Sequence, residues 1–546
     1  MDRGKRIEEN LLHYVGTVTH TGTELERNNE IFFKEWTDKC SYFKNHPEHW
    51  GLYPVKNDHL DRKIPWAFLK GKGNKTVVMI HHTDTVDTDD YGQYQEYAYK
   101  PYELAELYKT GKVSFNEETK EDLDSGEWLF GRGASDMKSG GAMHLSLFEE
   151  YAQEDFQGNI LLMGLPDEEN SSAGMRSAAY LMKELKEKYD LDYVLMLNGE
   201  PHERVDENKI TIYDGSIGKI MPIFLARGKL SHVGQIYLGV NPVNMLAEVV
   251  RRTELNTEFM EEAGNTVAPP GTWLYFKDRK EVYDVSLPLT AGGYMSILPL
   301  KRSPMDIMNR LKEITTDAFQ NVIDDMKDSY ERFRKISPVD YGEMNYEPKV
   351  LFYDDIYKAV VEESGEEFLE NLKKKEEEII ELLNQDEISR VEGAYRLIEF
   401  TLSYYKNRDP LIVLALAPPY YPSTSNYDLP NAQEMEDFVK DLFKYAKEEV
   451  GQELEIQNYF TGICDLSYGM FTDSDETIEY IKNNMLLWGE NYEIPLELIK
   501  EMSMPVLNIG AWGKDLHKYT ERIYKEDLLE KVPKLIDYTV RSFLKE

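Results

Sequence analysis

The segment Thr76-Val-Val-Met-Ile-His-His-Thr-Asp-Thr-Val86 joins an apolar run to a polar end. Val77 to Ile80 is typical of a strand that is buried on both faces of a sheet. Sites in open α/β sheets form where strands end at their carboxyl edge, so the polar residues that follow predict a site. His82 and Asp84 point to the same side of an extended chain, so His82 can bind a metal through one ring nitrogen while Asp84 orients the ring. A lone His-x-Asp pair is a weak signal, and a loop histidine beside a solvated aspartate is the alternative.

Two further apolar runs end in acidic residues in the same way. Residues 159–165 lead to Asp167-Glu168-Glu169, and residues 193–197 lead to Glu200. Helical patterns over 141–153 and 173–188 separate these runs. Strand, helix, strand with acids at each strand end predicts a mixed, mostly parallel sheet in an α/β fold.

The pattern changes near residue 209. Two rounds of strand and helix over 209–352 predict an inserted two-layer α+β domain. The catalytic domain is then expected over 1–208 and 353–546, with a charged helical excursion at 355–408 to which the sequence assigns no chemistry.

Composition excludes some classes of partner. The 546 residues carry a net charge of -37, which argues against nucleic acid and against an anionic membrane surface. Apolar runs long enough to span a membrane are absent from the sequence. The only two cysteines, Cys40 and Cys464, lack metal-site spacing, and the N-terminal residues lack a signal-peptide pattern. These features predict a cytoplasmic, globular protein.

The chemistry-bearing residues form one set when the strand ends are combined. The set contains two histidines and several carboxylates without cysteine, which suits zinc and also manganese or cobalt. Five ligands are too many for one tetrahedral zinc but suit two metal ions that share a carboxylate, an arrangement that polarises a carbonyl and generates hydroxide at neutral pH. In the adjacent pair Glu168-Glu169, one carboxylate can ligate while the other takes a proton from water. The candidate residues are His82, Asp84, Asp136, Glu168, Glu169, Glu200 and His517.

These residues carry a resemblance to the co-catalytic zinc hydrolases of the aminoacylase, acetylornithine deacetylase, succinyl-diaminopimelate desuccinylase and glutamate carboxypeptidase superfamily. Five blocks match in order: His82-Thr-Asp84-Thr-Val86, Gly131-Arg-Gly-Ala-Ser-Asp136-Met-Lys, Asp167-Glu168-Glu169, Gly199-Glu200-Pro201, and His517 followed by Glu521. The chain length and residues 355–408 and 417–422 resemble the long subgroup labelled arginine-utilisation proteins.

The resemblance implies a role for each residue of the set. Asp136 is expected to bridge two divalent metal ions. His82 and Glu200 are expected to complete one shell, and Glu169 and His517 the other. By the same resemblance Glu168 is the general base, Asp84 orients His82, and the Asp136–Met137 peptide bond is cis.

The resemblance also assigns a role to the inserted domain. It would act as a lid or as a dimerisation domain, and His232 would stabilise the oxyanion, often in the active site of a partner subunit. The predicted function is hydrolysis of an amide bond in a small molecule, such as an N-acyl amino acid or a short peptide. The alternatives are a non-catalytic relative that binds a metabolite and an amidase of a guanidino or ureido compound in arginine breakdown.

Overall fold

The computed structural model describes residues 2–489 and 491–545 of the chain. Met1 and Glu546, the outer limits of the predicted catalytic domain, and Glu490 lie outside the described residues. The chain forms two compact units. Unit 1 comprises residues 1–217, 422–472 and 494–546, and unit 2 comprises residues 218–421 and 473–493.

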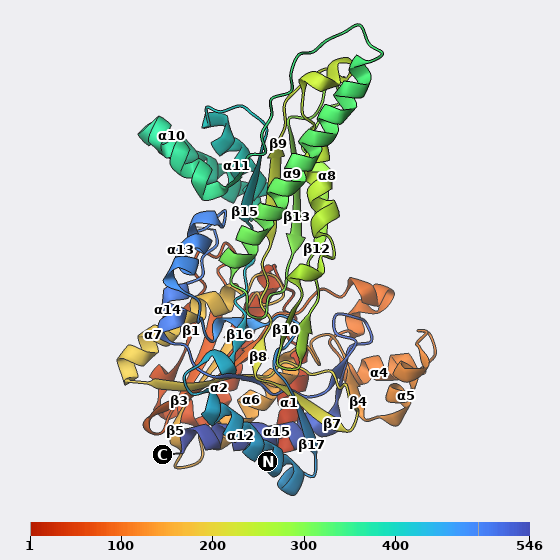
Figure 1. Ribbon diagram of the computed structural model, residues 1–546. Coiled ribbons are helices and arrows are strands. Elements are labelled where there is room, and N and C mark those ends of the chain that lie inside the picture. Colours follow the sequence, from red (N-terminus) through yellow and green to blue (C-terminus); the bar gives the residue numbers. More distant parts are fainter. Residues whose placement is uncertain (1, 490, 546) are drawn as a thin grey trace. The chain divides into compact units, whose positions relative to one another are not determined.

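Unit 1 is built around an eight-stranded mixed sheet (Figure 1). Its central strands β5, β3, β6 and β18 run parallel to one another. At one side of the sheet, β2 is antiparallel to β5 and β1 is antiparallel to β2. In sheet order the strands are β1 (Trp50–Pro54), β2 (Lys63–Lys70), β5 (Gln157–Leu165), β3 (Lys72–His82), β6 (Asp192–Asn198), β18 (Val506–Asn508), β7 (Lys209–Tyr213) and β17 (Glu453–Gln457).

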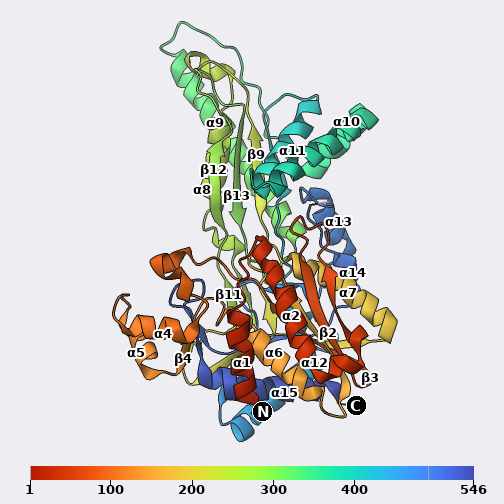
Figure 2. The same ribbon diagram turned by 180° about the vertical axis from the view of Figure 1, so that it is seen from behind.

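Helices cover both faces of this sheet because β3 is apolar on both sides. Val77 and Met79 join a core cluster with α1 (Arg3–Val15), α6 (Lys138–Tyr151) and α15 (Val532–Leu544), three helices seen together in Figure 2. Val78 and Ile80 point to the other face and are fully buried there. Helix α7 (Ala173–Tyr189) packs on β1, β2 and β5. The remaining helices of unit 1 are α2 (Asn28–Lys39), α3 (Ser41–Asn45), α4 (Pro101–Lys109), α5 (Glu117–Ser125), α12 (Ala432–Tyr445) and α14 (Leu496–Glu501).

A three-stranded sheet supports the segment that contains Asp136. It consists of β4 (Trp128–Phe130), β20 (Arg522–Tyr524) and β19 (Gly513–Lys514). Because β4 pairs with β20, residues 131–136 lie beside Glu521, which precedes β20. A short pair, β8 (Gly215–Ser216) and β16 (Thr424–Ser425), completes the strands of this unit.

Unit 2 contains a five-stranded sheet and its own helices. In sheet order the strands are β12 (Thr272–Asp278), β13 (Thr290–Ser296), β9 (Pro222–Arg227), β15 (Leu411–Leu416) and β14 (Val350–Phe352). A hairpin is formed by β10 (Glu261–Ala263) and β11 (Thr266–Ala268). Helices α8 (Pro242–Thr253) and α9 (Pro304–Arg334) run along the long strands (Figure 1), and α13 (Asp475–Asn484) also belongs to this unit.

Residues 353–421 and 473–493 pack with unit 2, whereas the sequence placed them in the catalytic domain, and residues 209–217 pack with unit 1 rather than with the inserted domain. For residues 353–421, the reason is β15, which pairs with β9 over six residues and thereby becomes a central strand of the unit 2 sheet. Helices α10 (Tyr353–Asn384) and α11 (Arg390–Tyr404) pack together on this sheet in a core that includes Leu225 and Val413. Among the described residues, no helix of either unit is long and apolar enough to cross a lipid bilayer.

Candidate active site

The ends of the parallel strands in unit 1 bring the predicted residues together. His82 is the last residue of β3, Glu168 and Glu169 follow β5, Glu200 follows β6, and His517 lies in the segment after β18. Because β5, β3, β6 and β18 are neighbours with the same direction, their carboxyl ends meet at one edge of the sheet. Asp136 reaches this edge from the turn immediately before α6.

The turn is held close to the sheet by glycine. A Cβ atom on Gly140, in the first turn of α6, would lie 2.3 Å from the carbonyl oxygen of Gly199. Any larger residue would push α6 away from the segment that carries Glu200. Gly140 therefore allows Asp136 and Glu200 to approach the same point.

The first candidate metal set consists of His82, Asp136 and Glu200, all of them buried. The Nε2 atom of His82 lies 2.8 Å from Oδ1 of Asp136 and 3.6 Å from Oε1 of Glu200. The ligand atoms of the set lie within 4.8 Å of one another.

The second candidate set consists of Asp136, Glu169 and His517. The Nε2 atom of His517 lies 3.1 Å from Oδ2 of Asp136 and 3.0 Å from Oε2 of Glu169. Asp136 therefore directs one carboxylate oxygen to each set. His517 has a positive φ of 62°, and its side chain is 50% exposed, so this set faces solvent on one side.

The electrostatics of the cluster favour a cation. Burial lowers the pKa of His82, but the carboxylates of Glu200, Asp136 and Asp84 outweigh burial and raise it well above its usual value. Hydrogen bonds that the His517 imidazole donates to the carboxylates of Asp136 and Glu169 raise the pKa of His517 to about 10. Burial raises the pKa of Glu200, and the charges of Asp136 and Glu169 raise it further. The surplus carboxylate charge that raises these two pKa values is charge that divalent cations would neutralise.

The donor set fits such cations. Both sets consist only of imidazole nitrogen and carboxylate oxygen, which suits zinc, manganese and cobalt. The ligand atoms already converge, and one carboxylate is shared in the way that a two-metal centre requires.

Asp84 orients both His82 and the acidic pair. The Nδ1 atom of His82 lies 3.0 Å from the main-chain oxygen of Asp84, so an Nδ1–H donor leaves Nε2 available as a ligand. The Asp84 carboxylate accepts hydrogen bonds from the backbone N–H groups of Glu168 (3.1 Å) and Glu169 (3.2 Å). One carboxylate thereby fixes the adjacent pair relative to His82.

Glu521 holds Asp136 from the other side. Its Oε1 atom accepts hydrogen bonds from the backbone N–H groups of Ser135 and Asp136, both at 3.1 Å. Its Oε2 atom accepts from Arg132 at 2.8 Å. The peptide bond between Asp136 and Met137 is cis in the structure.

A buried ion cluster anchors the acidic pair from outside the site. Arg62 donates to Asp167, which precedes Glu168, and to Glu26, both at 2.7 Å. Glu26 in turn accepts from the backbone N–H of Asp167 at 2.9 Å. No local pattern identifies Arg62 or Glu26, because both lie more than a hundred residues before Asp167 and match no motif.

Asp465 is a further carboxyl group that sequence reasoning missed. It is 2% exposed and contributes to the raised pKa values of Glu168 and Glu200. Burial raises its own pKa to about 7, although a hydrogen bond from Ser172 lowers it. It lies eight residues after the end of β17, so the strand-end rule does not find it.

Two other histidines lie elsewhere. His81 is fully buried and stacks on Phe33 with ring centroids 5.9 Å apart, which is a packing role. His232 belongs to unit 2, where it is exposed and its Nδ1 accepts a hydrogen bond from the N–H of Gly234 at 3.1 Å.

A carboxyl edge of an α/β sheet that carries two candidate cation sites with a shared aspartate is an arrangement that suits the class of metal-dependent hydrolases. The comparison with known families agrees with this class. The chain belongs to peptidase family M20/M25/M40, whose family model matches residues 81–532.

Relatives support this assignment over most of the chain. The chain is 32% identical to the uncharacterized protein YqjN of Bacillus subtilis over 92% of its own length and 90% of that protein. It is 28% identical to protein RocB of the same organism, with 100% of this chain and 96% of that protein covered, in agreement with the long arginine-utilisation-type subgroup. It is also 28% identical to a succinyl-diaminopimelate desuccinylase of Burkholderia cenocepacia, over 38% of this chain and 49% of that enzyme.

Solved structures confirm the predicted fold class. Aminopeptidase PepT of Bacillus cereus superposes with a TM-score of 0.53 at 12% identity, covering 99% of both chains. A metallo-carboxypeptidase of Sulfolobus solfataricus gives 0.52 at 11% identity, covering 100% of both chains. Together with the family assignment, these findings identify the protein as a hydrolytic enzyme of the metallopeptidase and amidohydrolase type.

Proposed function

We propose that the protein hydrolyses an amide bond in a small molecule, either an N-acyl amino acid or a short peptide, with two divalent metal ions. The observation that carries this proposal is the pair of donor sets that share Asp136, with Glu168 beside them. The desuccinylase among its relatives is an enzyme named for removing a succinyl group from an amino acid, which supports the N-acyl class.

His82, Asp136 and Glu200 would hold one cation, and Asp136, Glu169 and His517 the other. When bound, two such cations polarise a substrate carbonyl and lower the pKa of water. We assign zinc first, and manganese and cobalt as the alternatives that the same donor set accepts.

Glu168 would move the proton. Its backbone is fixed by Asp84, and its side chain is half-buried at the sheet edge. Burial raises the pKa of Glu168 well above its usual value, and the charges of Glu200, Asp465 and Glu169 add to this effect. A carboxyl group of raised pKa can take a proton from the attacking water and return it to the departing nitrogen.

His232 would serve as an oxyanion donor. Because its Nδ1 accepts the Gly234 N–H, the neutral ring carries its proton on Nε2, which can donate to a developing negative charge.

We further propose that unit 2 mediates a homodimer. Its edge strand β12 exposes Leu274 and Phe276, and among the described residues no further strand pairs with its outer side, as at edges that accept another strand.

The test combines metal analysis with hydrolysis. Purified protein is analysed for metal by mass spectrometry and assayed against N-acyl amino acids, di- and tripeptides, and ureido and guanidino acids, with and without a chelator. We expect two metal ions per chain and chelator-sensitive turnover. Glu168→Gln should retain the metal and lose turnover by about 10²–10⁴-fold. Glu187→Gln, an exposed glutamate on α7, is the matched control.

Two results would overturn the proposal. A protein that binds no metal after reconstitution and hydrolyses nothing in the panel would be a metabolite-binding relative. A Glu168→Gln variant with unchanged turnover would remove Glu168 from the reaction.

A further inference from the structure

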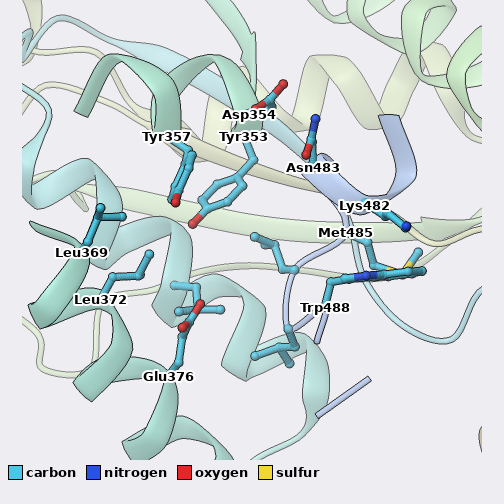
Figure 3. A pocket seen from close by; sticks show the side chains of 13 residues that line it. Tyr353, Asp354, Tyr357, Leu369, Leu372, Glu376, Lys482, Asn483, Met485 and Trp488 are labelled. Carbon is cyan, nitrogen blue, oxygen red and sulfur yellow. The ribbon is translucent and has the colours of Figure 1, made fainter. Parts of the chain in front are cut away.

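A cavity of about 360 Å³ lies in unit 2 between α10 and residues 482–488 (Figure 3). Each charged residue that lines it already has a partner within the protein. Asp354 pairs with Lys358 at 2.6 Å. Glu376 and Lys482, the other two charged residues of the lining, also interact with residues of the chain. A different group, in unit 1, has ligand atoms that face one another at longer distances.

This group is the turn His46-Pro-Glu-His49, which brings three candidate metal ligands together between α3 and β1. The N–H of His49 donates to the main-chain oxygen of His46 at 3.1 Å, which closes a 3₁₀ turn. Side chains three residues apart eclipse one another in such a turn. The two imidazoles therefore stack, with centroids 5.1 Å apart and ring planes inclined by 8°.

The distances within the group fit the ligands of one metal ion better than they fit hydrogen bonds. Oε1 of Glu48 lies 3.6 Å from Nε2 of His49 and 3.9 Å from Nδ1 of His46. Both distances exceed the length of a protein hydrogen bond, which is about 2.7–3.2 Å. Two ligands of one tetrahedral zinc ion lie about 3.4 Å apart, because each is about 2.0–2.2 Å from the metal. The three ligand atoms all lie within 4.8 Å of one another, so small rotations of the side chains would close them around an ion.

His49 is the buried and oriented member of the group. It is 6% exposed, and its ring packs against that of Phe68. Its Nδ1 atom lies 2.8 Å from the Tyr42 hydroxyl, which also accepts the N–H of Lys70. An Nδ1–H donor to this hydroxyl leaves Nε2 available on the side of Glu48, as in histidines that ligate metals. Burial lowers the pKa of His49, although the charge of Glu48 opposes this effect, so the ring is neutral at pH 7 and able to ligate.

The other two ligands are open to solvent. The side chains of His46 and Glu48 are 44% and 55% exposed, so an ion can enter without opening the fold. Their exposure also leaves room for water at a fourth position, as in zinc sites with three protein ligands. The ring of His46 lies 4.7 Å from that of Tyr42, which limits its rotation away from the group.

The group lies away from the candidate active site. Tyr42 bonds to Lys70 at the end of β2, and Lys70 pairs with Asn159 near the start of β5. Glu168 and Glu169 follow the end of that strand. The group therefore lies towards the opposite edge of the sheet and shares no residue with either active-site donor set.

We propose that His46, Glu48 and His49 bind a zinc ion or a similar divalent transition-metal ion, which ties the end of α3 to the start of β1. Two imidazoles with one carboxylate suit zinc, nickel and copper, whereas magnesium and calcium prefer oxygen ligands. The ion strengthens the connection between α3 and the sheet and takes no part in the proposed hydrolysis. The inference is therefore independent of that reaction.

Equilibrium dialysis of the full-length protein against micromolar free zinc tests the proposal, with bound metal measured by mass spectrometry. The wild type should bind one zinc ion per chain more than His46→Ala, whatever the candidate active site holds. Glu48→Gln should weaken the binding of this additional zinc by at least about tenfold, a loss found even for residues that only orient a ligand. His59→Ala and Glu24→Gln, at exposed residues of the same unit, are the matched controls and should retain the full zinc content.

A second measurement separates this ion from loosely bound zinc. An ion that binds only the folded chain stabilises it, so zinc should raise the urea midpoint of the wild type more than that of His46→Ala. An excess of magnesium should not displace the additional zinc, because the group offers only one carboxylate. Circular dichroism verifies that each variant is folded before dialysis.

Four outcomes would overturn the inference. An equal zinc content of the wild type, His46→Ala and Glu48→Gln would show that the group binds no ion. An equal loss of zinc in His59→Ala would show that any surface histidine binds it. Displacement of the additional zinc by magnesium would exclude imidazole ligands, and an equal rise of the urea midpoint in the wild type and His46→Ala would place the stabilising ion elsewhere.

Discussion

Replacing Arg132 with methionine should destabilise unit 1 and disturb the segment that carries Asp136. Arg132 is 1% exposed and donates to the Glu521 carboxylate at 2.8 Å. Glu521 is fully buried and holds the backbone N–H groups of Ser135 and Asp136. The variant therefore leaves a buried carboxylate that has lost its cation but keeps two backbone donors.

The magnitude follows from the burial of both partners. Removing one member of a buried ion pair costs about 3–5 kcal/mol, and the two remaining backbone hydrogen bonds place the expected loss near the lower end, at about 3 kcal/mol. The loss should depend on pH. Burial already raises the pKa of Glu521 to about 7, and Arg132 opposes that shift, so the variant raises it further. A carboxyl group that binds its proton more tightly when folded than when unfolded loses stability as pH rises, so the loss should be larger at about pH 8 than at about pH 5.

The assay is urea unfolding of chelated protein by circular dichroism for the wild type, Arg132→Met, Glu521→Gln and the double variant. Because the chain forms two compact units, the slopes of unfolding free energy against urea concentration are compared among the variants before free energies are extracted. The double variant should be more stable than the sum of the single losses predicts, because the uncompensated charge is gone. Strict additivity of the two losses, or a loss of the same size at both pH values, would refute the reasoning.

Three further outcomes follow from the site. Asp84→Ala should weaken metal binding by about 10–100-fold in a chelator competition, because His82 and the Glu168–Glu169 pair lose the residue that anchors both. An unchanged metal affinity would contradict this role of Asp84. His232→Ala should lower kcat by about 10²–10³-fold with unchanged metal content. The control His59→Ala, at an exposed histidine, should leave kcat unchanged. Equal kcat values for the two variants would exclude His232 from the reaction. In metal-free protein, the raised pKa of His517 (about 10, against 6.5) gives stability that is complete below about pH 6.5 and lost as pH rises towards 10. His517→Ala should flatten that decline in urea unfolding, and an equally steep decline would show that His517 does not cause it.

The sequence predicted the sheet edge at which these side chains meet because the relevant signal is local. An apolar run followed at once by a polar side chain marks both a strand and its carboxyl end, as at His82 and Glu200. Parallel strands then place these ends together without any knowledge of distances. His517 is different, because it lies nine residues after β18, so the end of the strand alone does not determine where its side chain lies.

The membership of residues 353–421 could not be predicted from local pattern. The run 411–416 reads as a buried strand, and it is one, but periodicity does not reveal its partner. That partner is β9, almost two hundred residues earlier in the chain. Sheet partners that far apart are selected by the packing of the whole unit, which no short window of sequence contains.

The ion pairs that support the site were hidden for a similar reason. Arg132 belongs to a recognised block and Glu521 to another, yet their contact joins positions 389 residues apart. Arg62 belongs to no block, although it anchors the residue before Glu168. A single charged residue in a sequence reads as surface charge, and only burial distinguishes the few that are structural.

The catalytic edge has more negative than positive charge, and this imbalance links metal binding to folding. Two imidazoles face six carboxyl groups, which are Asp84, Asp136, Glu168, Glu169, Glu200 and Asp465. Burial raises the pKa of several of these groups, so the metal-free protein must either retain protons or bear repulsion. Divalent cations that bind only the folded chain relieve that repulsion and add stability in proportion to the logarithm of their concentration over Kd. The same carboxylates that would weaken an isolated fold therefore make unit 1 selective for the metal-loaded state.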